Sequence, residues 1–418
     1  MALLEHSGFG SQNITSGTQV FDFSDRLLAN LRLEEAALAH IPIGDVIKDP
    51  VCYWVEDALV GDTVALTATL ATAGTTITVS AADALKIGYN ADSSLVRPGA
   101  IIQRYQTDAG VAVDNGEKLQ VTAWGSSTTA TVTRSYGATA DPGSSYLSGT
   151  DFRLVGWPLP EGSNLGPDQS QARTPRYNLT QIFGRDITLT RNQIMRMMRS
   201  VDDEFMYQVD QRAIEVRREL NMSVIFGESS TSISGTFPVT PANSGDNRTM
   251  AGIIQFLTDA GGAAAGATYD STAEAFTSKL LNGMHYASAI LGGNPTTLLM
   301  GGLQSRAVNG FGADQIRIVP DSRYRQGWTT VYRTDTGKVL YFLTDFNMSF
   351  GAQGTVALID ETRLALRYVE DAAFFVLVAP TFTDGDSARV LGEWSLECRN
   401  AIGTLAAHAI HTALTVPS

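Results

Sequence analysis

Residues 192–226, NQIMRMMRSVDDEFMYQVDQRAIEVRRELNMSVIF, carry the strongest regular pattern in the chain. Apolar or small residues recur every three or four positions, close to the 3.6-residue period of an α-helix, at Met198, Val201, Phe205, Val209, Ala213, Val216 and Leu220. Gly227 follows the pattern as a stop signal. We therefore predict a single helix over residues 192–226. About thirty residues of helix extend about 45 Å, so this element would be a spine that crosses a whole domain.

The segment before this helix predicts a long β-hairpin that a separate module interrupts. Residues 51–60, VCYWVEDALV, predict one strand, and the alternating DITLT at 186–190 predicts a second strand over 184–191. We interpret 51–60 and 157–191 as the two legs of one hairpin. Residues 61–156 are rich in Thr, Val, Ala, Gly and Ser, with turn signals between short predicted strands at 75–80, 100–105, 118–123, 129–136 and 152–156. This spacing predicts an inserted all-β module, either a barrel or a sandwich.

Residues 1–50 are predicted to form an N-terminal arm. The first twenty residues are polar and lack a basic segment followed by an apolar one, so we expect no secretory signal peptide. Residues 25–40 have helical spacing, and Ile-Pro-Ile-Gly at 41–44 interrupts it. A helix behind a long tail needs another surface to lie on. In an assembly, a neighbouring subunit would provide that surface.

Helices and strands alternate beyond Gly227. A loop over 228–250 precedes predicted helices at 272–291 and 304–311 and a short buried strand at 295–300. Strands then dominate, at 329–332, 339–343, 355–360, 373–378 and 388–398, before an Ala-rich strand or helix at 401–413. The predicted fold class is therefore α+β.

The composition of the 418-residue chain argues against several classes of protein. Its net charge is −13 and its pI about 4.8, whereas tight binding of nucleic acid needs clustered Lys and Arg. An acidic chain could still line a container that holds DNA. Cys52 and Cys398 do not make a disulfide framework. No stretch approaches the roughly 18 consecutive apolar residues of a membrane span.

The sequence lacks the usual signatures of catalysis and metal binding. It has no nucleophile elbow, no phosphate-binding loop and no dinucleotide fingerprint. His408 and His411 would share one face of a helix, but no Cys or carboxylate lies beside them, so we expect ordinary structural positions. Asp202, Asp203 and Glu204 would fan out around a helix axis, which favours dipole stabilisation and subunit salt bridges. We predict no catalytic residue, no cofactor and no metal site.

The order of the predicted elements is an arm, a long hairpin, a spine helix, a mixed region and a β-rich C-terminal half. Short motifs accompany this order at 53–57 (YWVED), 177–183 (YNLTQIF), 203–204 with 207–208 (DE and YQ), 225–227 (IFG), 295–299 (PTTLL) and 396–400 (LECRN). In order and spacing they resemble the major capsid (major head) proteins of tailed bacteriophages, which have the Hong Kong 97-type capsid fold. The resemblance covers most of the chain outside 61–156.

The resemblance implies a division of the chain into the domains of that fold. The arm is 1–50, and the extended loop is 51–60 with 157–191. A peripheral domain would comprise 192–250 and 329–400, with the spine helix at 192–226, and an axial domain would comprise 251–328 and 401–418. The module at 61–156 departs from the shortest members of the family. We expect it to be a stabilising or interaction surface.

The resemblance also implies a structural role. Copies of the chain would form pentamers and hexamers and close into an icosahedral shell around double-stranded DNA, without sequence-specific binding and without a membrane. Assembly would take place in the host cytoplasm, the product would be the virion, and the partners would be a separate scaffolding protein, a portal and a decoration protein. The predicted subunit-interface residues are Trp54, Glu56, Asp57, Asp202, Asp203, Arg217 and Arg218.

Three other functions remain open from the sequence alone. A non-viral nanocompartment built on the same fold would have a similar sequence pattern. A bacterial surface or adhesion protein with a β module would carry a signal peptide, which we do not find at the N-terminus. An enzyme with a β-rich accessory domain would need a convergent polar cluster in a pocket, and the sequence offers no candidate for one.

Overall fold

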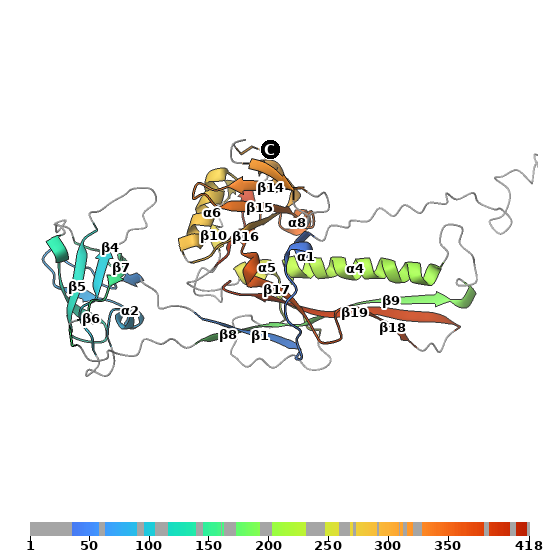
Figure 1. Ribbon diagram of the computed structural model, residues 1–418, viewed down its shortest axis with the longest axis horizontal. Helices are drawn as coiled ribbons and strands as arrows, with labels where there is room; N and C mark the ends of the chain where they lie inside the picture. The colour runs from blue at the N-terminus through green and yellow to red at the C-terminus, as the bar shows by residue number, and fades with distance from the viewer. Residues whose placement is uncertain are drawn as a thin grey trace, which may run out of the picture. The chain divides into compact units, whose positions relative to one another are not determined.

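The computed structural model of the chain is a mixed α/β structure that divides into two compact units (Figure 1). One unit comprises Met1–Glu56 with Pro175–Ser418, and the other comprises Asp57–Thr174, which we call the barrel unit. The structure describes residues 36–57, 63–89, 96–104, 116–138, 145–159, 161–162, 173–192, 203–230, 247–258, 268–270, 273–290, 292–308, 310–311, 316–320, 328–379, 384–401 and 407–415. The predicted arm helix at 25–40 is described only at α1 (Ala36–His40).

The barrel unit is a six-stranded antiparallel sheet that closes on itself. Its strands run in the order β2-β7-β4-β5-β6-β3, and a bridge between Leu66 and Val79 joins the β2 end to the β3 end. The strand bounds are β2 (Thr63–Ala65), β3 (Thr76–Thr78), β4 (Ile101–Arg104), β5 (Lys118–Trp124), β6 (Thr129–Thr133) and β7 (Asp151–Gly156). The five strands predicted here are present, in a barrel and not a sandwich.

The expectation that this region is entirely β-structure is wrong at two places. Residues Ala81–Lys86 form a short helix, α2, because Ser80 caps it by accepting the backbone N–H of Asp83 at 3.1 Å. A single turn of 3-10 helix at Tyr136–Ala138 follows β6. The barrel has a core of its own, whose largest fully buried side chains include Tyr146, Phe152 and Ile102.

The hairpin exists, but its second leg differs from the predicted one. β1 (Val51–Glu56) pairs with β8 (Thr174–Leu179) and not with residues 184–191. Residues 184–191 belong to β9 (Gln181–Thr190), which pairs antiparallel with β19 (Gly385–Cys398) over ten positions. The alternation explains the choice, because β9 buries Phe183, Ile187 and Leu189 on one face and needs a sheet with a covered side.

The spine helix is shorter than predicted. It is α4 (Glu204–Phe226), and Asp203 is its N-cap, with extended backbone and a carboxylate that accepts the N–H groups of Phe205 and Met206. The predicted single helix over 192–226 is therefore interrupted at Asp203, whose extended backbone cannot continue a helix, although Arg191 and Asn192 are helical. Residues 193–202, with the predicted positions Met198 and Val201, lie outside the described residues. The 23 residues of α4 extend about 35 Å.

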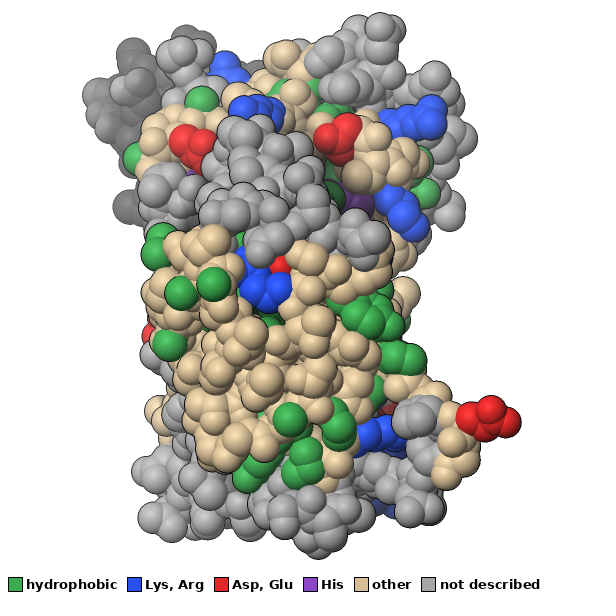
Figure 2. All heavy atoms as spheres, turned by 90° about the vertical axis from the view of Figure 1, so that its left-hand side faces the viewer, with side chains coloured by type: hydrophobic (Ala, Val, Ile, Leu, Met, Phe, Trp, Pro, Cys, Tyr) green, Lys and Arg blue, Asp and Glu red, His purple; other side chains and the backbone are tan. Residues whose placement is uncertain are grey.

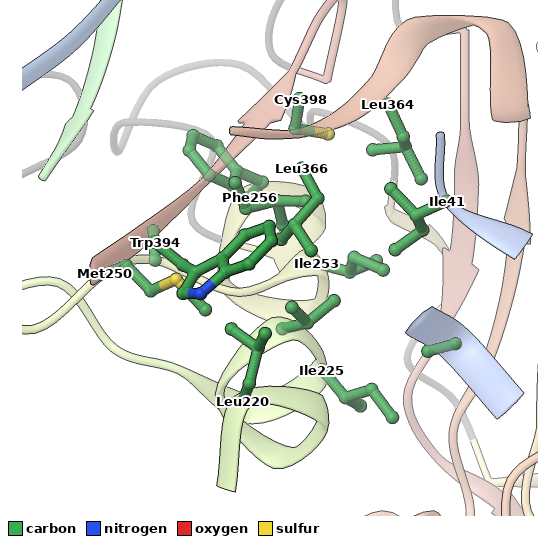
Figure 3. Packing of buried hydrophobic residues seen from close by; sticks show 14 of the residues in the cluster. Ile41, Leu220, Ile225, Met250, Ile253, Phe256, Leu364, Leu366, Trp394 and Cys398 are labelled. Atoms are coloured by element: carbon green, nitrogen blue, oxygen red, sulfur yellow. The ribbon is translucent and has the colours of Figure 1, made fainter. Parts of the chain in front are cut away.

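α4 lies on a four-stranded antiparallel sheet and carries the main core of its unit (Figure 3). The sheet contains β9, β19, β17 (Leu364–Tyr368) and β18 (Phe375–Ala379), and α5 (Ile253–Thr258) packs beside α4. Val209, Val216 and Leu220 are buried, as the sequence pattern predicts. Gly227 ends the helix where Gly252 donates its N–H to the Gly227 carbonyl, and a Cβ on Gly227 would lie 2.6 Å from the Met250 carbonyl oxygen.

A second, seven-stranded sheet has the order β10-β20-β16-β12-β15-β14-β13. Its strands are β10 (Thr268–Asp270), β12 (Thr297–Met300), β13 (Ile316–Pro320), β14 (Trp328–Arg333), β15 (Val339–Thr344), β16 (Val356–Ile359) and β20 (Ala409–His411). Leu299 faces the α4 core, and Leu298 faces a separate core with α6 (Ser278–Ile290). Because both faces are covered, the central strands are fully buried, in agreement with the apolar run PTTLLM.

The strand pairing differs from two expectations for this part of the chain and decides a third that the sequence left open. β14 pairs with β15, β15 pairs with β12, and β16 pairs with both β12 and β20, so residues 328–359 lie in one sheet with β12, whereas the predicted division places 329–400 in a different domain from β12. The predicted helix at 272–291 starts only at Ser278, because β11 (Glu274–Ala275) pairs with β21 (Leu414–Thr415). The Ala-rich segment is a strand at Ala409–His411. Three short helices complete the unit: α7 (Gly302–Val308), α8 (Met348–Gly351) and the 3-10 turn Glu361–Arg363.

Within the described parts of the chain, no helix is both long enough and apolar enough to span a membrane.

His408 is fixed in a neutral form beside this sheet. Its Nδ1 accepts the Asp360 N–H at 3.1 Å, so the proton sits on Nε2, which donates to the Arg399 carbonyl at 3.1 Å. The side chain is buried, and burial lowers the pKa of His408 from 6.5 to about 4. As the pH falls, His408 therefore takes up a proton at a higher pH in the unfolded chain than in the folded chain.

We predict that acid destabilises this unit through His408. As pH falls from about 6.5 to about 4, the unfolded state takes up a proton that the folded state does not, and the free energy of unfolding decreases by at most about 3 kcal/mol. His408→Asn keeps an acceptor for the Asp360 N–H and removes the titration. Urea midpoints at pH 7, 5.5 and 4.5 should fall less steeply in this variant, and equal slopes in both proteins would contradict the assignment.

Candidate assembly site

Three motifs far apart in the sequence meet where the hairpin joins the four-stranded sheet, a region we call the hairpin root. The motifs are YWVED at 53–57, YNLTQIF at 177–183 and LECRN at 396–400. They lie on β1, on β8 with β9, and at the end of β19. Their polar side chains turn inward and hold these strands to α5 and to one another.

Asn178 is the central residue of the hairpin root. Its side chain is fully buried on β8, and its Nδ2 donates to the Leu396 carbonyl at 2.7 Å and to the Ala251 carbonyl at 3.1 Å. Its Oδ1 accepts the Ala251 N–H at 2.9 Å. One amide thus satisfies three backbone groups on two other segments. This arrangement ties the hairpin leg to β19 and to the residues that precede α5.

Thr180 lies between β8 and β9, where the chain stops pairing with β1 and begins to pair with β19. Its N–H donates to the Pro50 carbonyl at 3.0 Å, and its hydroxyl lies 2.5 Å from Glu393 Oε1. Arg248 donates to the same carboxylate oxygen at 3.0 Å. Ser395 donates its hydroxyl to the Leu179 carbonyl at 3.0 Å. The Glu393 and Ser395 side chains of β19 therefore hold the two residues that join β8 to β9.

Glu56 closes the opposite side of the hairpin root. Its Oε1 accepts the Trp54 indole N–H at 3.2 Å and the Asn400 N–H at 2.7 Å, and its Oε2 lies 3.4 Å from Arg176 Nε. Asn400 has a positive φ of 53°, a conformation that Asn tolerates better than most residues. Glu397 is buried and forms ion pairs with Arg367 and Arg399, whereas Glu56 is partly buried. Each buried carboxylate here has an arginine, as burial of a charge requires.

The predicted interface residues divide into two groups. Trp54 is buried against Phe256, with ring centroids 6.0 Å apart, and Glu56 is used inside the chain as described above. These two side chains are therefore elements of the hairpin root and not of an exposed surface. Asp57 is exposed and lies 3.7 Å from exposed Arg173, a pair of the kind that contributes little to stability.

The other predicted interface residues lie on or near α4. Asp203 is exposed and caps the helix, Arg217 is exposed, and Arg218 is partly exposed. Asp202 lies outside the described residues. Two acidic side chains of the same helix form ion pairs within the chain, since Arg185 on β9 lies 2.9 Å from Glu219 and 3.9 Å from Glu215. Arg217 and Arg218 thus stay candidates for contacts with another subunit.

The described His and Cys side chains that could act in catalysis or metal binding are separated from one another or unreactive. His411 Nε2 lies 3.3 Å from Glu274, and His408 is occupied by backbone groups. In the part of the chain that the structure describes, no group of three His, Cys, Asp or Glu side chains could hold a metal ion. Burial raises the pKa of Cys52 to about 12 and also raises that of Cys398, so both thiols stay protonated and unreactive.

Comparison with known protein families identifies the family to which the chain belongs. Residues 12–415 match the family model described as SU10 major capsid protein. The chain belongs to the SU10 major capsid protein family. It is a structural component of a phage shell, located in the virion, and not an enzyme.

Solved structures of capsids resemble this SU10-type capsid protein at low identity. A structure of Mycobacterium phage Bobi matches 98% of this chain and 99% of its own, with 11% identity and a TM-score of 0.46. The capsid of a native GTA particle matches 98% and 99%, with 10% identity and a TM-score of 0.46. The SrpI encapsulin of Synechococcus elongatus matches 59% and 78%, with 13% identity and a TM-score of 0.41. No curated protein matches the chain.

These TM-scores lie below 0.5, so the family assignment depends on the family model alone. That model describes a capsid protein and therefore does not favour the nanocompartment alternative. Sequence reasoning located the motifs of the hairpin root but missed what Asn178 and Glu393 do. The available signal was a polar residue inside an apolar strand pattern, as in Tyr-Asn-Leu at 177–179, which indicates a buried hydrogen-bonding role.

We predict that Asn178→Ala weakens the capsid protein at the hairpin root. The change leaves the Ala251 N–H and two carbonyls buried without their partner, which should lower the free energy of unfolding by about 2–4 kcal/mol. Thr188→Ala, at an exposed position of β9, is the matched control and should change it by less than about 0.5 kcal/mol. Denaturant unfolding of both variants measures the difference. Equal stability of the two variants would show that Asn178 is dispensable.

Proposed function

We propose that this chain is a Hong Kong 97-type capsid subunit that forms pentamers and hexamers and closes into an icosahedral shell around double-stranded DNA. The observation that carries the proposal is the match to a capsid family over residues 12–415. The element order supports it, with the β1–β8 hairpin as the extended loop and α4 as the spine helix. The four-stranded sheet then corresponds to the peripheral domain, and the seven-stranded sheet to the axial domain.

The barrel unit corresponds in this proposal to a module inserted in the extended loop. The chain enters it after β1 and leaves it at β8, and these two strands pair with each other. A module with its own closed sheet and core can be placed on a hairpin without disturbing the strands that carry it. We assign it a stabilising or interaction role at the surface of the shell.

In this proposal the shell encloses the DNA without binding it tightly. The chain carries a net charge of −13, and on the face shown in Figure 2 the Lys and Arg side chains of the described residues are scattered singly. Binding that depends on phosphate contacts needs such charges in a cluster. The remaining partners in the proposal are a separate scaffolding protein, a portal and a decoration protein, with assembly in the host cytoplasm.

We expect the chain to assemble when it is expressed by itself. Size-exclusion chromatography should give species much larger than one subunit, and negative-stain electron microscopy should show capsomer rings, tubes or closed shells. A chain that stays a clean monomer at every concentration would contradict the proposed function. Closed shells of uniform size, formed from this chain alone, would contradict the separate scaffolding protein only.

We also expect Arg217 to contribute to contacts between subunits. Arg217→Glu reverses a charge on the exposed side of α4, and it should reduce the yield of particles roughly tenfold if that side meets a neighbour. Lys279→Glu reverses an exposed charge on α6 and serves as the control. Particle yield by sedimentation, together with thermal melting of each variant, separates an assembly defect from misfolding. Equal yields for the two variants would remove Arg217 from the interface.

A further inference from the structure

Strand β18 carries an unusual run of exposed apolar side chains. The exposed fractions are 40% for Phe375, 44% for Val376, 51% for Leu377 and 66% for Val378. The surrounding segment 372–379, AAFFVLVA, contains no charged residue. Isolated exposed apolar side chains are common, but a contiguous run on one strand indicates an interaction site.

Both faces of β18 contribute to this exposure. Val376 and Val378 pair with Val390 and Ala388 of β19, and directly paired residues lie on the same face of a sheet. On β19 that face is buried, at 2% and 3% exposure, as part of the side on which α4 packs. The apolar layer therefore continues sideways onto β18 beyond the cover that α4 supplies. On the other face, Phe375 and Leu377 are also exposed, and Leu377 lies beside Arg389 of β19, whose charge is paired with Asp186.

The backbone of β18 is open along one edge. The other edge pairs with β19, and among the described strands β18 has no second partner. Phe374 anchors the start of the strand, because its ring lies 5.2 Å from the Trp394 ring and against Gly392, where a Cβ would lie 2.6 Å from the ring. The strand is thus held on one side by β19, while no other described strand pairs with the N–H and C=O groups of its other edge. Such an edge pairs readily with another chain unless charges or proline protect it.

We propose that β18 is a docking strand that a second copy of this chain covers in the assembled particle. The inference rests on the proposed function, because only an assembled shell brings copies close enough to occupy the strand. An uncharged surface suits a like partner, since a charged strand would repel the same strand or its surroundings on another copy. The free edge supplies hydrogen bonds to the second copy, and the two apolar faces supply buried area.

Thiol labelling tests whether the strand is covered on assembly. Val378→Cys and the control Tyr286→Cys on α6 place a cysteine at positions with 66% and 57% exposure, whereas Cys52 and Cys398 are buried and set the baseline in the unmodified chain. A bulky maleimide should label both introduced cysteines in the dissociated chain. In particles, we expect labelling at position 378 to fall at least tenfold while labelling at 286 continues.

Charge insertion tests whether the contact is needed. Val378→Asp should reduce the particle yield at least tenfold without lowering the melting temperature of the subunit, and Tyr286→Asp should assemble normally. If Val378→Asp fails to fold, the conservative cysteine variant decides the question.

The outcomes separate this inference from the proposed function. An unmodified chain that never associates overturns both. Particles in which position 378 labels as readily as position 286 overturn the docking strand and leave the shell intact. Protection at 378 that occurs only when another virion protein is present overturns a second copy as the occupant.

Discussion

The fold depends on the ten-position ladder between β9 and β19, which joins residues 181–190 to residues 385–394. The two strands are about 200 residues apart in the chain, so the ladder closes a long loop before it gains any local contact. Once formed, it provides the platform on which α4 packs and the strand to which β17 and β18 attach. Its end near Gln181 and Trp394 also fixes the place where the hairpin leaves the sheet.

The hairpin root fixes the direction in which the hairpin leaves this ladder. Asn178, Thr180 and Glu56 lie at its end, and each makes hydrogen bonds to segments remote in sequence. Buried polar groups of this kind add little net stability when satisfied, but they are costly when a strand shifts and leaves them unpaired. They therefore select one register and one direction for the hairpin. For a subunit that must repeat the same contacts in every copy, a unique direction matters more than extra stability.

The sequence predicted the helices and strands better than it predicted which strands pair with each other. The barrel strands, the hairpin leg β1 and the apolar stripe of α4 follow from local patterns of period 2 and 3.6, which a single segment displays. The partner of β1 does not, because strand pairing is decided by tertiary contacts: β9, the strand with the alternating pattern, pairs with β19, and β8 pairs with β1. The start of α4 was missed since Asp203 fits both a helical charge pattern and a cap. The assignment of 328–359 failed for the same reason as that of the hairpin, because strand pairing is not local.

The two units treat their strand edges in opposite ways. The barrel unit joins its first and last strands through the Leu66–Val79 bridge, so its sheet is closed where it would otherwise invite pairing. The four-stranded sheet instead ends in β18, whose outer edge pairs with no other described strand and whose segment 372–379 carries no charged residue. A monomer under selection for solubility would not retain such a strand. In a shell protein the edge has a use, because each copy meets others at fixed angles and an unsatisfied edge makes the free subunit less stable than the assembled one.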